Sequence, residues 1–311
     1  METTCAAEKE FGKELGMVHE GIITLRNLGL TAKGWQKMAE DKDLAGRVVA
    51  LIEGEKETWL LKILSAEHAR HSAFFDKEFD FTDFEATLKK YGKKKIRFWA
   101  KLGLEPHFLP RMPMDKNLNF PGWRVKPKDW FYTQVASGNI FRNQNGSLVA
   151  DRVVELEGIT VLIDTRLKPA YDNGKQMWKD DSLLGGIIAN LRKQGKIESY
   201  NDGPQSSRFG VSADEWENTI KPVYAAKLNL NTNQLRLERA IEANVIPQIY
   251  THMPRKDDGK TNTGVWYEEY FGDRDGRLDG GDFAHGGLAD VSHGRSGVQW
   301  RYESFRPLAV L

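Results

Sequence analysis

The stretch from residue 280 to residue 311 constrains the fold of this chain more than any other part. It runs GGDFAHGGLADVSHGRSGVQWRYESFRPLAVL, a mixture of Gly, His, Arg and aromatic residues that closes on a short apolar run. Neither the 3.6-residue period of a helix nor the two-residue alternation of a strand runs through it. Such a stretch is either a loose tail or a displayed surface held by a hidden scaffold. The preceding sequence decides between the two.

Helical periodicity dominates the sequence before about residue 125. In the segment 81–92, Thr82 and Glu85 have the spacing of a capping box, and Gly92 is placed to end the helix. Apolar residues at helical spacing predict helices over 31–41, 41–54, 81–92 and 93–103.

The proline-rich segment 105–130 follows these helices and predicts a wrapping linker. We therefore expect a mostly helical N-terminal domain with its linker over 1–125 and a second domain over 126–311. The chain is long enough for such a division into two domains.

The second part of the chain mixes predicted strands and helices. A β-branched apolar run predicts a buried strand over 159–167. Ser212 and Glu215 have the spacing of a second capping box, and Pro222 predicts a kink in the helix that follows. The expected stripe of that helix includes Val223 beside its larger apolar residues. Helices are predicted over 181–197, 211–228 and 236–250, and helical periodicity disappears after residue 255.

Composition excludes several classes of protein. The 45 basic and 44 acidic residues nearly cancel, so no overall electrostatic footprint for nucleic acid is present. The single cysteine, Cys5, rules out a disulfide framework within the chain. The opening METTCAAEKEFGKEL is charged, and no run has the roughly 18 apolar residues of a membrane span. We expect a protein that is cytoplasmic as synthesised, and surface or virion display stays open.

Three clusters have the residue types of a functional site, each with a simpler interpretation. His68 and His71 could share one helix face as metal ligands, but no partner motif accompanies them. The lysines of 89–95 straddle a predicted helix end, where cations complement the helix dipole. The carboxylates of 273–282 lack the EF-hand pattern, and a turn between two strands explains them. We therefore expect no metal and no nucleic-acid partner.

Several segments, in order, resemble the formylglycine-generating-enzyme branch of the C-type lectin fold. VSADEW (211–216) resembles the start of that fold's helix, and RLERAIE (236–242) resembles a second family segment. The pair Gly280–Gly281 resembles its glycine turn, and SFRP (304–307) resembles its terminal strand. The sequence departs from the family pattern at Glu238, Ala243 and Ser304.

This resemblance implies an α+β fold, with a C-terminal C-type lectin domain after a mostly helical N-terminal domain. Enzymes of the branch use cysteines near their C-terminal end, and this chain has none there, so that catalysis does not carry over. The related sulfoxide synthases need an iron site of three histidines. His68 and His71 supply two candidates, which keeps an iron-dependent enzyme of this type as the alternative. We expect no enzyme activity, no catalytic residues and no cofactor.

The whole layout resembles the variable proteins of diversity-generating retroelements. In that family the lectin domain ends the chain, and its last segment is rewritten at adenines from a template repeat. The resemblance implies a ligand-binding protein with a variable region at about 280–304, whose ligand is an unidentified protein or surface. Its oligomeric state stays open. The recognition residues that we expect are Phe283, His285, Ser292, His293, Gly294, Arg295, Val298, Gln299, Arg301 and Tyr302.

Codon chemistry and packing divide this region further. Residues such as His, Arg, Tyr and Gly are reached from AAY codons, whereas Gln299, Trp300 and Glu303 are not and would be fixed or come from another codon type. Among the aromatic residues, we expect Trp300 and Phe305 to be buried in the scaffold. The polar and aromatic recognition residues should converge on one exposed surface. The scaffold residues that we expect are Leu278, Leu288, Val291, Trp300, Phe305, Leu308 and Val310.

Overall fold

The computed structural model describes residues 31–42, 58–144, 146–164, 183–251, 264–272 and 275–311, together with 23, 26, 44, 46 and 181. The chain forms two compact units, Met1–Lys62 and Ile63–Leu311. In the first unit, α2 (Ala32–Glu40) confirms the predicted helix, and the Thr31 hydroxyl caps it by accepting a hydrogen bond from Gly34 N. The helix predicted over 41–54 lies mostly outside the described residues.

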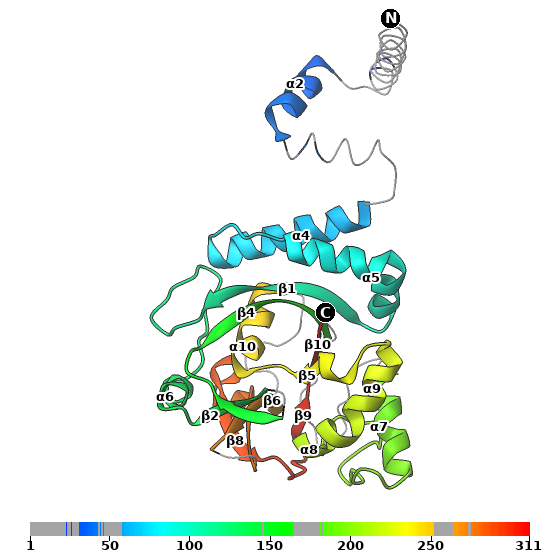
Figure 1. Ribbon diagram of the computed structural model, residues 1–311, viewed down its shortest axis with the longest axis vertical. Helices are drawn as coiled ribbons and strands as arrows, with labels where there is room; N and C mark the ends of the chain where they lie inside the picture. The colour runs from blue at the N-terminus through cyan, green and yellow to red at the C-terminus, as the bar shows by residue number, and fades with distance from the viewer. Residues whose placement is uncertain are drawn as a thin grey trace, which may run out of the picture. The chain divides into compact units, whose positions relative to one another are not determined.

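The second unit is an α+β structure whose sheets are largely antiparallel, as Figure 1 shows. One sheet lies against the helix α5 (Thr82–Lys101). The helix α4 (Thr58–Phe75) precedes α5, and its residues from Ile63 onward belong to this unit. The strands of this sheet, in spatial order, are β1 (Leu104–Pro113), β4 (Glu155–Asp164), β10 (Pro307–Val310) and β5 (Leu235–Leu237).

The proline-rich segment is not a linker, because its first part is strand β1. This strand pairs with β4 from Leu104↔Asp164 to Pro113↔Glu155. β1 is the edge strand of its sheet, and an edge strand tolerates proline because half of its N–H groups point away from the ladder. The chain accordingly divides between Lys62 and Ile63 rather than near residue 125.

Local capping signals give mixed results. Gly92 interrupts α5 with a φ of 75°, as predicted. The prediction of a capping box at Thr82 and Glu85 is wrong. The Thr82 hydroxyl donates to Asp80 Oδ1 at 2.6 Å, and the helix begins after Phe81. The second capping box is confirmed, since Ser212 and Glu215 exchange hydrogen bonds at the start of α8 (Ala213–Glu215).

A second sheet carries the C-terminal region. Its strands, in spatial order, are β3 (Ser147–Ala150), β2 (Ile140–Gln144), β6 (Gly264–Phe271), β7 (Gly276–Gly280) and β8 (Val291–Arg295). The short strand β9 (Glu303–Phe305) pairs in parallel with β6. The segment 273–282 was predicted to be a turn between two strands. Residue 275 lies between β6 and β7, but 276–280 form β7 itself, and residues 273 and 274 lie outside the described part.

Helices fill the space around both sheets. They include α6 (Asp129–Ser137), α7 (Leu184–Lys193), α9 (Lys221–Leu228) and α10 (Ala240–Ile249). Pro222 lies in the first turn of α9, and a π-helical turn, Trp216–Ile220, stands between α8 and α9. Its wider turn shifts the phase of the apolar stripe. Val223 is therefore 37% exposed, which contradicts its predicted place in that stripe.

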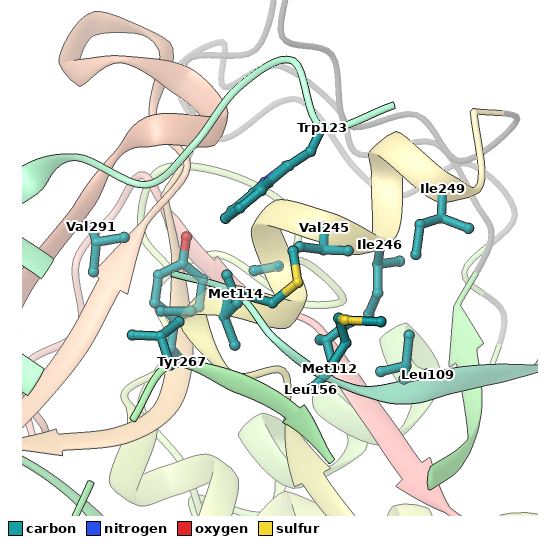
Figure 2. Packing of buried hydrophobic residues seen from close by; sticks show 14 of the residues in the cluster. Leu109, Met112, Met114, Trp123, Leu156, Val245, Ile246, Ile249, Tyr267 and Val291 are labelled. Carbon is teal, nitrogen blue, oxygen red and sulfur yellow. The ribbon is translucent and has the colours of Figure 1, made fainter. Parts of the chain in front are cut away.

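The main core lies between the two sheets and is centred on α10, whose residues are all buried. Figure 2 shows Ile246 of α10 beside Met112 and Val245 beside Met114, with Tyr267 and Val291 of the second sheet toward the other side of the core. The polar residues Glu242, Asn244 and Gln248 are buried along with the apolar ones, so α10 is enclosed on all sides. The two sheets therefore share one core, and the C-terminal region is part of it.

Buried ion pairs hold α10 to its surroundings. Glu242 accepts two hydrogen bonds from the Arg236 guanidinium, each at 2.6 Å, and a third from Arg239 N at 2.9 Å. Arg239 in turn donates to Asp151 at 2.8 Å and lies 3.5 Å from Glu269. Buried charges need such partners to offset their lost hydration.

The scaffold predicted for the C-terminal region is confirmed except at one residue. Phe305 is fully buried, and its ring packs against that of Trp216 at 5.2 Å between centroids. Trp300 is 39% exposed, so its predicted burial is wrong. It lies in the loop between β8 and β9, where no strand ladder draws it inward. Leu278, Leu288, Val291 and Leu308 are buried, and Val310 is partly buried.

Within the described part of the chain, no helix has both the length and the apolar character that crossing a membrane requires.

Candidate functional site

The antiparallel strands β7 and β8 and the segments 281–290 and 296–303 form the candidate site. We call this region the β7–β8 face. Along β8, Val291 is buried, whereas Ser292, His293 and Arg295 are exposed. The first residue of β8 is thus buried in the core, and most of its other side chains are exposed to solvent. Two adjoining pockets open on this face.

The smaller pocket has a volume of about 230 Å³ and lies over β7, β8 and the start of β9. We call it the acidic pocket, because four carboxylates and one ammonium group line it. Its lining residues are Lys128, Gly264, Asp279, Gly280, Asp282, His285, Asp290, Ser292, His293, Gly294, Trp300, Tyr302 and Glu303.

The carboxylates of the acidic pocket perturb one another. Burial and then the charge of Asp290 raise the pKa of Asp279 to about 7, while Lys128 opposes the rise. Burial also raises the pKa of Asp290, although the Lys128 ammonium, 3.2 Å from Asp290 Oδ1, favours its ionised form. The one ammonium group is thus engaged by Asp290, and Asp279 is about half protonated near neutral pH.

Aromatic rings belong to the β7–β8 face. Trp300 and Tyr302 line the acidic pocket and have ring centroids 6.1 Å apart. The exposed His293 ring also lines this pocket and stacks on Phe271 at 4.1 Å and on Trp130 at 5.7 Å. Aromatic rings at a surface provide contact area with few rotatable bonds, as in antibody loops. The face can therefore stack against a ligand as well as pair with its charges.

The second pocket is larger and more open, and its volume is about 870 Å³. His293 and Gly294 line both pockets, so the two form a continuous hollow. The residues that line the second pocket are Asp214, Phe271, Gly272, Asp275, Gly276, His293, Gly294, Arg295, Ser296, Gly297 and Val298.

The structure brings most of the expected recognition residues together. Those lining the acidic pocket are His285, Ser292, His293, Gly294 and Tyr302, and those lining the second pocket include His293, Gly294, Arg295 and Val298. Gln299 is half-buried and Arg301 exposed, and neither lines one of these two pockets. The side chain of Phe283 lies outside the described part of the structure.

The chain matches no known protein family, no curated protein and no solved structure. The resemblance to the C-type lectin fold therefore stays a prediction from the sequence segments, whose places in the structure are as follows. VSADEW leads into α8, and RLERAIE runs from β5 into α10. SFRP joins β9 to β10. All three segments lie in the part of the second unit that supports the β7–β8 face.

Sequence reasoning missed several residues of this site. Lys128 and Trp130 belong to the segment interpreted as a linker, and Phe271 ends a strand that was not predicted. Asp279 was assigned to a turn, although it lies in β7. No sequence signal joins these positions, because long-range strand pairing places them beside β8. The run of carboxylates in 273–282 was the one local hint of an acidic site.

The two histidines considered as metal ligands do not face a common point. His68 is exposed and lies 3.6 Å from Glu78. His71 is buried, and its ring nitrogens each lie 2.8 Å from a backbone carbonyl oxygen, those of Glu67 and Phe108. Burial lowers the pKa of His71, while the Glu67 carboxylate opposes the shift. This arrangement supports a packing role for His71, and the described residues contain no group of three His, Cys, Asp or Glu side chains suited to a metal ion.

The lysine cluster 89–95 takes part in local pairing. Lys89 pairs with Glu85 at 2.7 Å within α5. Lys95 donates to the carbonyl oxygen of Leu228 at 2.7 Å and so ties α5 to the end of α9. A cation at a helix C-terminus also complements its dipole. These contacts fit the interpretation of the cluster as a solvated helix end.

Proposed function

We propose that this chain is a non-catalytic ligand-binding protein whose recognition surface is the β7–β8 face. The observation that carries this proposal is that the C-terminal region combines exposed polar side chains with a buried apolar scaffold. His285, Ser292 and His293 surround one hollow and are exposed, whereas Leu278, Val291 and Phe305 beneath them are buried. A scaffold of this kind lets surface residues change without loss of the core.

The family of this protein is the second part of the proposal. Order and spacing of the sequence segments, together with the α+β architecture, favour a C-type lectin-like domain of the formylglycine-generating-enzyme type. The 280–304 region has no helical or strand period in its sequence and exposes several polar side chains, which favours a variable protein of a diversity-generating retroelement. Its ligand would be a protein or a surface group, met by side chains that differ from one variant to the next.

Sequencing of the gene and its surroundings tests this family assignment directly. We expect a reverse transcriptase gene nearby and a repeat that matches the 3′ end of this gene except at adenines. The differing codons should fall within about 280–304 and spare Trp300 and Phe305. A locus without a reverse transcriptase and without such a repeat would remove the assignment to this family.

Triple substitution of His293, Arg295 and Tyr302 by alanine should leave the free energy of unfolding within about 1 kcal/mol of the wild type. The first two residues are exposed and the third is half-buried, so none fills the core. The same variant should lose binding to a ligand isolated with the wild type, because Arg and Tyr often dominate binding energies. Chemical denaturation measures the first outcome. A triple variant that fails to fold would mean that these residues belong to the scaffold.

A further inference from the structure

We propose that the acidic pocket of the β7–β8 face binds a primary ammonium group, such as the end of a lysine side chain. The inference rests on the proposed function, since it names the chemistry that this recognition surface accepts. The same chemistry can come from a free alkylamine or from a lysine on a protein ligand. Three observations carry the proposal: the charge of the pocket, a buried carboxylate with no hydrogen-bond donor among the described residues, and the shape of the cavity.

The charge of the pocket is unbalanced. Its lining contains the carboxyl groups of Asp279, Asp282, Asp290 and Glu303 against the single ammonium group of Lys128. Asp290 engages Lys128 at 3.2 Å and also faces Asp282 N at 3.4 Å. The His285 ring lies 3.5 Å from the Asp282 carboxylate. A ligand cation would complete the pairing that Lys128 alone leaves incomplete.

Asp279 is the carboxylate that lacks a partner. Its side chain is 8% exposed, lines the pocket and accepts no hydrogen bond from the residues that the structure describes. A buried carboxylate normally has hydrogen-bond donors or a countercharge, because its lost hydration is otherwise uncompensated. An ammonium group supplies both at once, since it carries one positive charge and three donors.

The cavity has the size and walls that an alkylammonium group needs. A Cβ atom at Gly294 would lie 3.1 Å from Asp279 Oδ2 and 3.4 Å from Trp300 Nε1, so this glycine keeps the carboxylate accessible. The volume of about 230 Å³ holds several waters at roughly 30 Å³ each, or a short alkyl chain with its head group. The Trp300 and Tyr302 rings offer faces to a cation.

An ammonium group fits this lining better than a metal ion. No three metal-ligating side chains of the described residues gather at one point, here or elsewhere. A calcium ion takes six to eight oxygen ligands, whereas an ammonium group is recognised by hydrogen bonds and by aromatic faces.

The acidic pocket combines positions that diversification would spare with positions that it would change. Asp279 precedes the region of about 280–304, and Trp300 and Glu303 are residues that AAY codons do not encode. His285 and His293 are reachable from such codons and stand at the exposed rim. The preference for a cation would therefore be common to the variants, while the rim would set which cation-bearing ligand each one accepts.

Titration with n-butylammonium, followed by NMR at the indole N–H of Trp300, tests the proposal on the full chain. A Trp300→Phe variant assigns the signal. We expect a saturable shift for n-butylammonium and for a terminally blocked lysine peptide, and none for n-butanol or the Nε-acetylated peptide. Asp279→Asn should weaken n-butylammonium binding at least tenfold, whereas Asp202→Asn, at an exposed carboxylate outside the pocket, should not change it.

The pH dependence supplies a second readout. With a pKa of about 7, Asp279 goes from about one-tenth ionised at pH 6 to about nine-tenths at pH 8, so affinity should rise about tenfold. The groups that face it are Lys128, Asp282, His285, Asp290, His293, Tyr302 and Glu303. The difference between the wild-type and Asp279→Asn affinity profiles isolates the contribution of Asp279 to the pH dependence.

Three outcomes would overturn the proposal. They are no shift with n-butylammonium, equal shifts with n-butanol, or displacement of the amine by stoichiometric Ca²⁺. Binding by n-butylammonium but not by the lysine peptide would assign the pocket to free amines, and binding by both would support a protein lysine as well. A failed amine titration beside a locus that carries the template repeat would refute this inference alone and leave the proposed function standing.

Discussion

Replacing Phe305 by alanine should lower the free energy of unfolding by about 3–5 kcal/mol. Phe305 is fully buried on β9, opposite Trp266 of β6 and 5.2 Å from the Trp216 ring. The Trp216 ring of the π-helical turn packs against the Phe305 ring, and β9 is held to β6 by its ladder, so we expect little collapse into the space that alanine would leave. Chemical denaturation at neutral pH measures the loss.

Trp300→Ala is the matched control for this substitution. Trp300 is also aromatic and lies five residues earlier in the chain, yet it is 39% exposed. Its replacement should cost about 1 kcal/mol, because much of its surface already meets water. Equal losses in the free energy of unfolding for the two variants, or a loss below about 1 kcal/mol for Phe305→Ala, would show that β9 does not pack in the core.

Elements with a strong local pattern were predictable from the sequence. The helices α2 and α7 and the Ser212 capping box are confirmed because their apolar spacing and capping residues lie within one or two turns. β1 was missed because three prolines in the strand imitate a loop, and only the edge position of β1 makes them acceptable. The π-helical turn was equally hidden, since no local signal distinguishes it from the α-helix around it.

Only part of the candidate site was predictable from the sequence, namely the exposed polar residues of the C-terminal region. His285, Ser292 and His293 were expected at the surface because an unpatterned polar stretch has no core face to present. Trp300 and Phe305 could not be distinguished, since pairing with β6 decides which aromatic residue is buried. The acidic pocket was not predictable, because Lys128 comes from a segment more than 150 residues away from β8 in the chain. The charged residues of such a pocket are brought together by tertiary structure, so the local sequence does not reveal them.

Glu242→Gln should destabilise the protein by about 3–5 kcal/mol at neutral pH, the usual cost of removing one partner of a buried ion pair. Glu242 is fully buried and accepts both hydrogen bonds of the Arg236 fork at 2.6 Å. A neutral amide keeps the shape of the carboxylate but leaves the charges of Arg236 and Arg239 without this countercharge. Chemical denaturation measures the difference, and Glu78→Gln, whose side chain is 81% exposed, should stay within about 0.5 kcal/mol of the wild type.

The pH dependence of this loss follows from the sign of the pKa shift at Glu242. Burial alone would raise its pKa, but the charges of Arg236 and Arg239 outweigh burial and hold the pKa below the ordinary value. A carboxyl group whose pKa is lower in the folded state adds stability above its unfolded pKa, about 4.3, and loses it as the pH falls through the folded pKa. The difference in the free energy of unfolding between the wild type and Glu242→Gln should therefore be constant from about pH 6 upward and shrink below about pH 4. A difference that stays unchanged down to the acid transition, or one no larger than that of Glu78→Gln at neutral pH, would refute the role of Glu242 as the ionised anchor of α10.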